Sequence, residues 1–224
     1  MRYGIYYAPA EDSAFWRLGS TWLGRDAATG EPLAQPDVPG IRERTVAPHR
    51  YGLHATLKAP IALADGSREE EFLEAVEAWA ARETPFVLPP LEVACLGDFV
   101  ALRPAGRCPE LEATAARCVR DLDRFRRPAG NAELARRRPE ALPGRERGYL
   151  VAWGYPYVFD AYRFHVTLSD GIADPHERQA FQAAAAGWMA GADLSAEPVA
   201  DACVFVEFAP NLPFRLVYRF RFNS

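Results

Sequence analysis

The chain has 224 residues, of which 49% are hydrophobic and 25% charged, and its formal net charge is −4. This composition excludes collagen-like, disordered and coiled-coil proteins. The sequence contains no run of about 18 apolar residues, so we expect no membrane-spanning helix. An acidic chain is also poorly suited to extended nucleic-acid binding, which needs a basic surface. A small anionic ligand that is held by a few local cations remains compatible with this charge.

The N-terminal segment and the cysteines predict a cytoplasmic protein. Glu11 and Asp12 stand where a signal peptide would need its apolar run, so we expect no export signal. The four cysteines show no CxxC or zinc spacing and are expected to be reduced thiols. No cluster of residues with metal-ligand spacing is evident either, and we expect neither a metal ion nor another cofactor.

Apolar periodicity predicts six elements in the first half of the chain. In chain order these are a strand over 2–7, a helix over 13–23, a strand over 50–58, a helix over 67–82, and strands over 86–96 and 99–103. Ser13 is the expected N-cap of the first helix, and Ser67 with Glu70 forms a capping box for the second. Residues 24–48 are rich in Gly and Pro and predict a long loop, a type of segment that is often functional. Whether it closes over a site is left open.

The second half repeats part of this order. Its predicted elements are helices over 109–124, 131–138 and 145–153, a strand over 163–169, a helix over 174–189, and strands over 199–208 and 214–222. Strand, helix, strand, strand thus occurs twice, beginning at 50 and at 163. This predicts one α+β domain over 1–224 with two pseudo-symmetric lobes around the strands 50–58 and 163–169. Each lobe would be an antiparallel sheet with helices on its outer face, and a cleft would lie between the lobes.

Two of the four histidines occupy equivalent places in this repeat. One strand contains the sequence His54-Ala55-Thr56-Leu57, and the other contains His165-Val166-Thr167-Leu168. A single His-x-Thr would be a weak signal, but two at the spacing of the repeat are a strong one. The alternative is that both histidines are structural residues with satisfied hydrogen bonds.

Strand alternation places the polar side chains of each motif on one face. That face carries His54, Thr56 and Lys58 on the first strand, and Arg163, His165 and Thr167 on the second. A two-fold axis would set His54 opposite His165 across the cleft, with a threonine hydroxyl beside each.

Such a pair of histidines suits the cleavage of a phosphodiester. A neutral imidazole can accept the proton of the attacking oxygen, and an imidazolium can protonate the leaving oxygen, if both pKa values lie near about 6.5. The hydroxyls of Thr56 and Thr167 can donate hydrogen bonds to the phosphoryl oxygens as negative charge develops. No metal ion is required. Which of His54 and His165 is the base is left open.

The two motifs resemble those of the 2H phosphoesterase superfamily, which includes bacterial 2′-5′ RNA ligase-like proteins and cyclic nucleotide phosphodiesterases. The resemblance implies that His54 and His165 are the acid and base and that Thr56 and Thr167 bind phosphate. The chain is most similar to a bacterial family of phosphonate-metabolism proteins encoded beside carbon–phosphorus lyase genes. The segments that carry this similarity are RYGIYYAP (2–9), STWLGRDAATG (20–30), PHRYGLHATLKAP (48–60), ELARRRP (133–139), WGYPYVFDAYRFHVTL (153–168) and the arginine-rich last strand.

Several other residues are candidates for binding substrate anions. The main ones are Lys58, Arg163 and Tyr6, the last because the strand 2–7 is expected to flank the histidine strands. Lys58 could equally be a solvated strand end. Weaker candidates are the arginines of the last strand, the loop element Gly24-Arg25-Asp26 and the run Arg136-Arg137-Arg138, for which solvated surfaces are the alternative.

The sequence therefore predicts a metal-independent phosphodiesterase whose partner is a small, phosphorylated and cyclic substrate. The phosphonate family suggests a ribose cyclic phosphate. The alternatives are a phosphodiesterase acting on RNA ends or 2′,3′-cyclic nucleotides, and a nucleotide- or phosphate-binding module without turnover. We expect no membrane and no extended nucleic-acid partner, and the oligomeric state is left open.

Overall fold

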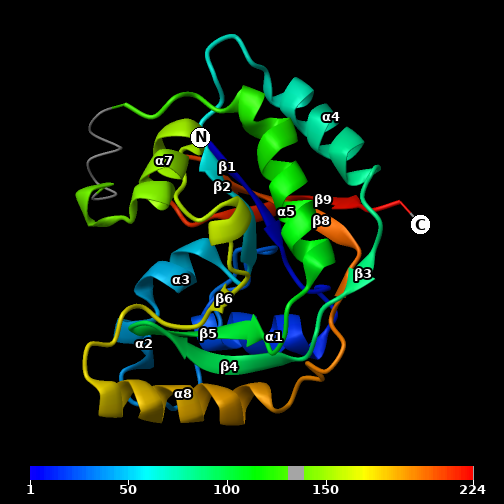
Figure 1. Ribbon diagram of the computed structural model, residues 1–224. Coiled ribbons are helices and arrows are strands. Elements are labelled where there is room, and N and C mark those ends of the chain that lie inside the picture. Colours follow the sequence, from blue (N-terminus) through cyan, green and yellow to red (C-terminus); the bar gives the residue numbers. More distant parts are fainter. Residues whose placement is uncertain (131–138, 224) are drawn as a thin grey trace.

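The computed structural model describes residues 1–130 and 139–223, and within them seven strands form one antiparallel sheet of order β4-β5-β6-β2-β1-β8-β9 (Figure 1). The strands of this sheet are β1 (Arg2–Tyr7), β2 (Ala55–Ile61), β4 (Leu91–Leu96), β5 (Phe99–Pro104), β6 (Val166–Thr167), β8 (Asp201–Glu207) and β9 (Arg215–Arg221). A separate two-stranded ladder pairs β3 (Phe86–Val87) with β7 (Pro198–Val199).

Helices cover the two halves of the sheet. The α-helices are α1 (Ala14–Leu23), α2 (Ile41–Arg44), α3 (Val46–Tyr51), α4 (Glu69–Ala80), α5 (Pro109–Leu122), α7 (Gly144–Trp153) and α8 (Pro175–Met189), and short 3₁₀ turns are η1 (Asp123–Phe125), η2 (Pro139–Ala141) and η3 (Phe159–Ala161). Helices α4 and α5 lie on the half that contains β1, β2 and β9, whereas α1 and α8 lie on the half that contains β4 and β5 (Figure 1). None of the helices in the described ranges is both long and apolar enough to cross a membrane.

The sheet confirms the predicted α+β fold and shows how its two halves are interleaved. The histidine strands β2 and β6 are neighbours at the centre of the sheet. The hairpin β4-β5 follows β2 in the chain but lies beside β6, and the hairpin β8-β9 follows β6 but lies with β1 beside β2. The two segments that cross between the halves pair with each other as β3 and β7. Each strand, helix, strand, strand unit thus contributes its hairpin to the opposite half.

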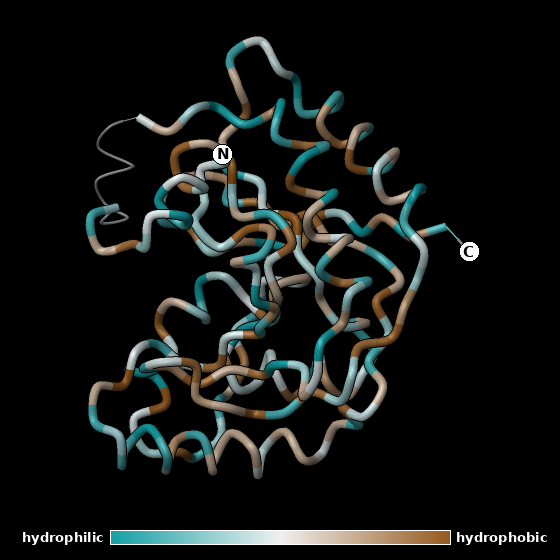
Figure 2. Tube along the Cα trace, viewed as in Figure 1, coloured by the Kyte–Doolittle hydropathy of each residue, from teal (hydrophilic) through white to brown (hydrophobic). Residues whose placement is uncertain are grey.

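One continuous set of buried apolar side chains holds both halves together. Its fully buried members include large aromatic residues from several elements, such as Trp22, Phe72, Trp79, Phe205 and Phe214. Hydrophobic and hydrophilic positions alternate along the outer helices α4 and α8, as expected for helices with one face on this core (Figure 2). The burial supplies the main stabilisation of the fold.

The structure changes several predicted boundaries. The strand predicted over 50–58 is wrong at its start: residues 46–51 form the helix α3, and β2 begins at Ala55. The buried guanidinium of Arg25 donates to the carbonyls of His49 and Arg50 at the end of α3, and so ends this helix one turn before the histidine motif. The second histidine strand is also shorter than predicted, because β6 comprises only Val166–Thr167.

Helix caps agree with the sequence in part. The Ser13 side chain accepts the N–H of Trp16 at 3.0 Å, as predicted for an N-cap. The predicted capping box of Ser67 and Glu70 is wrong, since α4 starts after Arg68 without a side-chain cap. The predicted loop over 24–48 contains the short helix α2 and the start of α3. The helix predicted over 131–138 lies outside the described residues.

Candidate active site

The two His-x-Thr motifs lie side by side on one face of the central strand pair. Strands β2 and β6 are antiparallel, with Ala55 opposite Val166, and both of these side chains are fully buried. Continuing this register by one residue in each direction sets His54 opposite Thr167 and Thr56 opposite His165. Because side chains alternate, all four point away from the face that holds the two buried residues.

This arrangement corrects the predicted geometry while keeping its symmetry. The two histidines immediately precede neighbouring strands of one sheet, β2 and β6, and the continued register makes them diagonal neighbours, a relationship with a backbone spacing of about 7–8 Å. A local two-fold axis passes between Ala55 and Val166. Continued in this way, the register sets each histidine across the ladder from the threonine of the other motif.

The two imidazole rings are held by matching hydrogen bonds. Nδ1 of His54 lies 2.9 Å from the carbonyl oxygen of Gly52, and Nδ1 of His165 lies 2.9 Å from that of Arg163. A carbonyl oxygen only accepts, so Nδ1 carries the hydrogen in both rings. Nε2 is therefore the atom of each histidine that is available to exchange a proton with a ligand.

The environment of the histidines shifts their pKa values away from the reference value that the sequence suggested. Burial lowers the pKa of His54 from 6.5 to about 4, and the positive charge of His165 contributes in the same direction. Burial also lowers the pKa of His165, against the opposing effect of its hydrogen bond to the Arg163 carbonyl. Both rings are thus neutral in the free protein at pH 7. An anion bound between them would favour protonation of the one that it contacts.

The threonines of the motifs are accessible to a ligand. Thr56 and Thr167 are partly buried, and neither hydroxyl makes a hydrogen bond to another residue in the part of the chain that the structure describes. Each lies one pleat away from the histidine of its own motif. Their assignment as phosphate-binding residues stays a prediction, which this placement makes geometrically possible.

Tyr6 packs against His54 through a stacked pair of rings. Its ring stacks on the His54 ring with centroids 4.0 Å apart and planes at 30°, and β1 places Tyr6 directly opposite Thr56. The tyrosine is fully buried, and its hydroxyl has no hydrogen-bond partner among the described residues. Burial raises the pKa of this hydroxyl well above its usual value, so it stays protonated. Tyr6 adjoins the site as predicted, but through the histidine ring rather than through an exposed surface.

Lys58 and Arg163 have different environments from those that strand alternation suggested. The Lys58 ammonium is buried, which excludes a solvated strand end, and donates to Asp123 Oδ1 at 2.9 Å and to the Val119 carbonyl. Asp123 in turn accepts from Arg126 at 2.8 Å. Arg163 is exposed, and the contribution that the structure assigns to it is the carbonyl that holds His165.

The weaker basic candidates are structural where the structure describes them. Arg25 is 5% exposed and donates to three backbone carbonyls, those of His49, Arg50 and Phe214. In the last strand, Arg215 donates to the Ala28 carbonyl, and Arg219 binds two carbonyls and Asp201. The run Arg136-Arg137-Arg138 lies outside the described residues.

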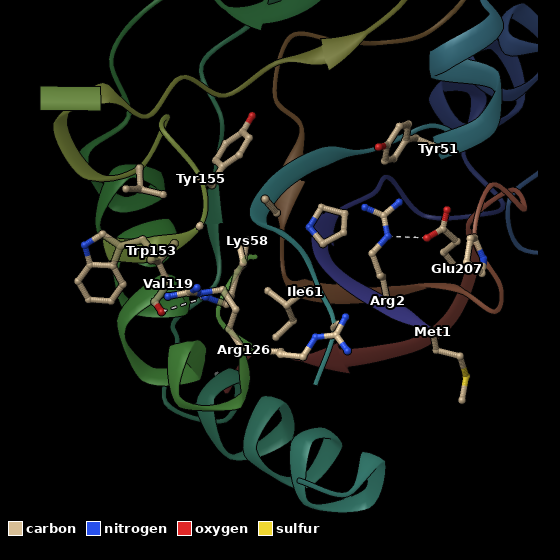
Figure 3. Close-up of a pocket in the computed structure, with 18 of the residues that line it drawn as sticks. Met1, Arg2, Tyr51, Lys58, Ile61, Val119, Arg126, Trp153, Tyr155 and Glu207 are labelled. Atoms are coloured by element: carbon tan, nitrogen blue, oxygen red, sulfur yellow. Dashed lines mark hydrogen bonds and ion pairs between the residues drawn. The ribbon is translucent and has the colours of Figure 1, made fainter. Parts of the chain in front are cut away.

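A cavity of about 580 Å³ adjoins the histidine pair on the β1-β2 side of the sheet. Figure 3 shows Arg2, Tyr51 and Glu207 on one side of it and Lys58, Val119, Arg126, Trp153 and Tyr155 on the other. Neither histidine lines the cavity, but the Tyr51 ring in its wall lies 5.9 Å from the His54 ring. Apart from Lys58, sequence reasoning missed this cavity, although Tyr51 lies in the similarity segment 48–60 and Trp153 and Tyr155 lie in the segment 153–168.

No metal centre stands out beside this site. Across residues 1–130 and 139–223, no three His, Cys, Asp or Glu side chains are grouped as metal ligands would be.

Comparison with known proteins places the chain in a family. The sequence profile of DUF1045, described as a protein of unknown function, matches residues 56–215, a range that begins two residues after His54 and includes His165. The chain belongs to the DUF1045 family. Together with the relatives described next, this match confirms the predicted resemblance to a known bacterial family.

Two curated relatives share a name. Both are called ribose 1,5-bisphosphate phosphokinase PhnN. One, from Janthinobacterium sp. (strain Marseille), is 42% identical over 76% of this chain, and the other, from Laribacter hongkongensis (strain HLHK9), is 38% identical over 96%. The matches cover 39% and 50% of those proteins, so this chain spans about half their length or less.

Two solved structures align with the whole of this DUF1045 chain and with 98% of their own chains. One is titled crystal structure of phosphoesterase, with 11% identity and a TM-score of 0.45. The other is LigT from E. coli complexed with NADP+, with 13% identity and a TM-score of 0.42.

Proposed function

We propose that this protein is a metal-independent phosphodiesterase that hydrolyses a small, cyclic phosphodiester. The observation that carries the proposal is the diagonal pair His54 and His165, with a free Nε2 on each ring and a threonine hydroxyl beside each. Two nitrogens on either side of one phosphate suffice for proton transfer at both the attacking and the leaving oxygen.

The reaction is a single displacement at phosphorus. A neutral imidazole accepts a proton from water through Nε2 while the water oxygen bonds to phosphorus. The bond from phosphorus to the leaving oxygen breaks, and the other imidazolium delivers its Nε2 proton to that oxygen. The hydroxyls of Thr56 and Thr167 donate hydrogen bonds to the two non-bridging oxygens, which carry the developing charge. The deeper burial that lowers the pKa of His54 to about 4 favours His54 as the base.

The name of the relatives supports a phosphorylated ribose as the substrate class. A kinase activity for this chain itself finds no support in its sequence. A phosphate-binding loop of the G-x-x-x-x-G-K-[ST] type needs a Gly-Lys pair, whereas the only lysine, Lys58, follows Leu57. Since the chain covers at most half of those relatives, we propose that it corresponds to a part with a phosphodiesterase function acting on a related ribose phosphate.

The alternatives differ in substrate or in turnover. An enzyme acting on RNA ends or 2′,3′-cyclic nucleotides would use the same chemistry, and a binding module would hold the phosphate without cleaving it. Hydrolysis of a ribose cyclic phosphate and of a 2′,3′-cyclic nucleotide, followed by phosphorus NMR, separates these cases. The proposal predicts conversion of a cyclic diester into a phosphomonoester. Binding of either compound without conversion would favour the module.

A further inference from the structure

The cavity beside the histidines concentrates positive charge in a chain that is acidic overall. Five cationic side chains line it, from β1, α3, β2 and the segment that follows η1: Arg2, Arg50, Lys58, Arg126 and Arg127. The protein as a whole carries a formal net charge of −4, so this grouping does not follow from the composition. It requires a local explanation.

Two carboxylates compensate part of this charge. Glu207, which is 2% exposed, binds both Arg2 and Arg50 and so holds the two guanidinium groups at one wall. Asp123 does the same for Lys58 and Arg126 at the other wall.

Five cations are thus balanced by two carboxylates, and three positive charges remain uncompensated. The exposed Arg127 has no carboxylate partner in the part of the chain that is described. Arg2 and Arg50 bind Glu207 through one nitrogen each, which leaves further N–H donors of each guanidinium for a ligand. Guanidinium groups that a carboxylate already fixes in place are well suited to phosphate, because they need little reordering on binding.

The cavity also lies within reach of a ligand bound at the histidines. Lys58 is two residues beyond Thr56 on the same strand, a separation of about 7 Å. Tyr51 connects the cavity wall to His54, and Trp153 offers an aromatic surface at the opposite wall (Figure 3). The volume of about 580 Å³ exceeds what a single phosphate needs and leaves space for part of the group attached to it.

We propose that this cavity binds a second, terminal phosphate of the substrate, so that the enzyme selects cyclic phosphodiesters that also carry a phosphomonoester. The inference rests on the proposed function for the position of the scissile phosphate between the histidines. It adds the substrate class: a compound with two phosphate groups on one sugar, one cyclic and one terminal.

Binding of stable product analogues tests the cavity independently of turnover. Adenosine 2′-monophosphate and adenosine 2′,5′-bisphosphate differ only in the terminal phosphate, and calorimetry gives the ratio of their dissociation constants. We expect the bisphosphate to bind at least about tenfold more tightly, the effect of one or two charge-assisted hydrogen bonds. Arg127→Gln and Arg50→Gln should each reduce this ratio severalfold. Arg107→Gln, at an exposed arginine that pairs with Glu112 outside the cavity, is the control and should leave the ratio unchanged.

The outcomes separate the two proposals. Equal affinity of the two nucleotides in the wild type, or no binding of either at millimolar concentration, would overturn the second-phosphate site. So would an unchanged ratio in Arg127→Gln, an exposed position where loss of the fold is not expected. If the ratio behaves as expected but no cyclic diester is hydrolysed, the cavity assignment stands and the phosphodiesterase proposal fails.

Discussion

Replacing Gly4 by alanine would disturb the ring that supports His54. Gly4 lies on the same face of β1 as Tyr6, and a Cβ at position 4 would be 2.4 Å from Cζ and 2.5 Å from Oη of that tyrosine. Because carbon atoms in contact are normally about 3.5–4.0 Å apart, the ring must move by about 1 Å. Tyr6 is fully buried between His54 and Phe205, so the displacement is transmitted to the stacked imidazole.

We expect Gly4→Ala to lower kcat for cyclic diester hydrolysis by about 10²-fold, the scale of a 1 Å misplacement of a catalytic group. Overpacking should also lower the free energy of unfolding by about 1–3 kcal/mol. The assay is kcat at saturating substrate together with a urea titration. Gly187→Ala is the matched control: Gly187 is an exposed position of α8, its Cβ would meet nothing within 4 Å, and the change should leave kcat unchanged. A folded Gly4→Ala protein with wild-type kcat would refute the view that Tyr6 positions His54.

Three further results are expected from the same assay. Thr56→Val and Thr167→Val should each lower kcat by about 10²-fold, because each removes one donor to the phosphoryl oxygens, and a change below twofold would exclude that role. Hydrolysis should persist in EDTA, and loss of activity that a divalent ion restores would indicate a metalloenzyme. The profile of kcat/KM against pH should be bell-shaped, with an acidic limb near pH 4 from His54 and an alkaline limb below pH 6.5 from His165, since burial lowers both pKa values. A profile that is flat between pH 4 and 8 would contradict this assignment of base and acid.

The sequence predicted the fold class and the histidine pair because both are properties of local pattern. The repeated order of strands and helices and the two His-x-Thr motifs are visible without any contact information. Alternation then predicted that each histidine shares a face with its threonine, and this stays a prediction. What alternation could not supply is which strands are neighbours: pairing of β2 with β6, and the exchange of hairpins between the halves, depend on contacts far apart in the chain.

Buried polar partners explain the errors at individual residues. Residues 50 and 51 were predicted to start a strand but belong to the helix α3. The reason is that Arg25, from a distant loop, binds the carbonyls at the end of this helix. Lys58 looked like a free cation, but Asp123 lies 65 positions later and pairs with it. The reference pKa of histidine likewise failed for His54, because it neglects the aromatic rings of Tyr6 and Tyr51 around the imidazole. None of these contacts has a sequence signal of its own.

The central claim is that His54 and His165 together carry the chemistry, and single-turnover rates of the two asparagine variants test it most directly. With a cyclic phosphodiester and EDTA present, His54→Asn and His165→Asn should each react about 10²–10⁴-fold more slowly than the wild type while binding product with similar affinity. The base and the acid act together in one step, so losing either one already removes most of the benefit of the pair. The double variant should therefore be little slower than the slower single variant. A rate within twofold of the wild type in either single variant would contradict the account.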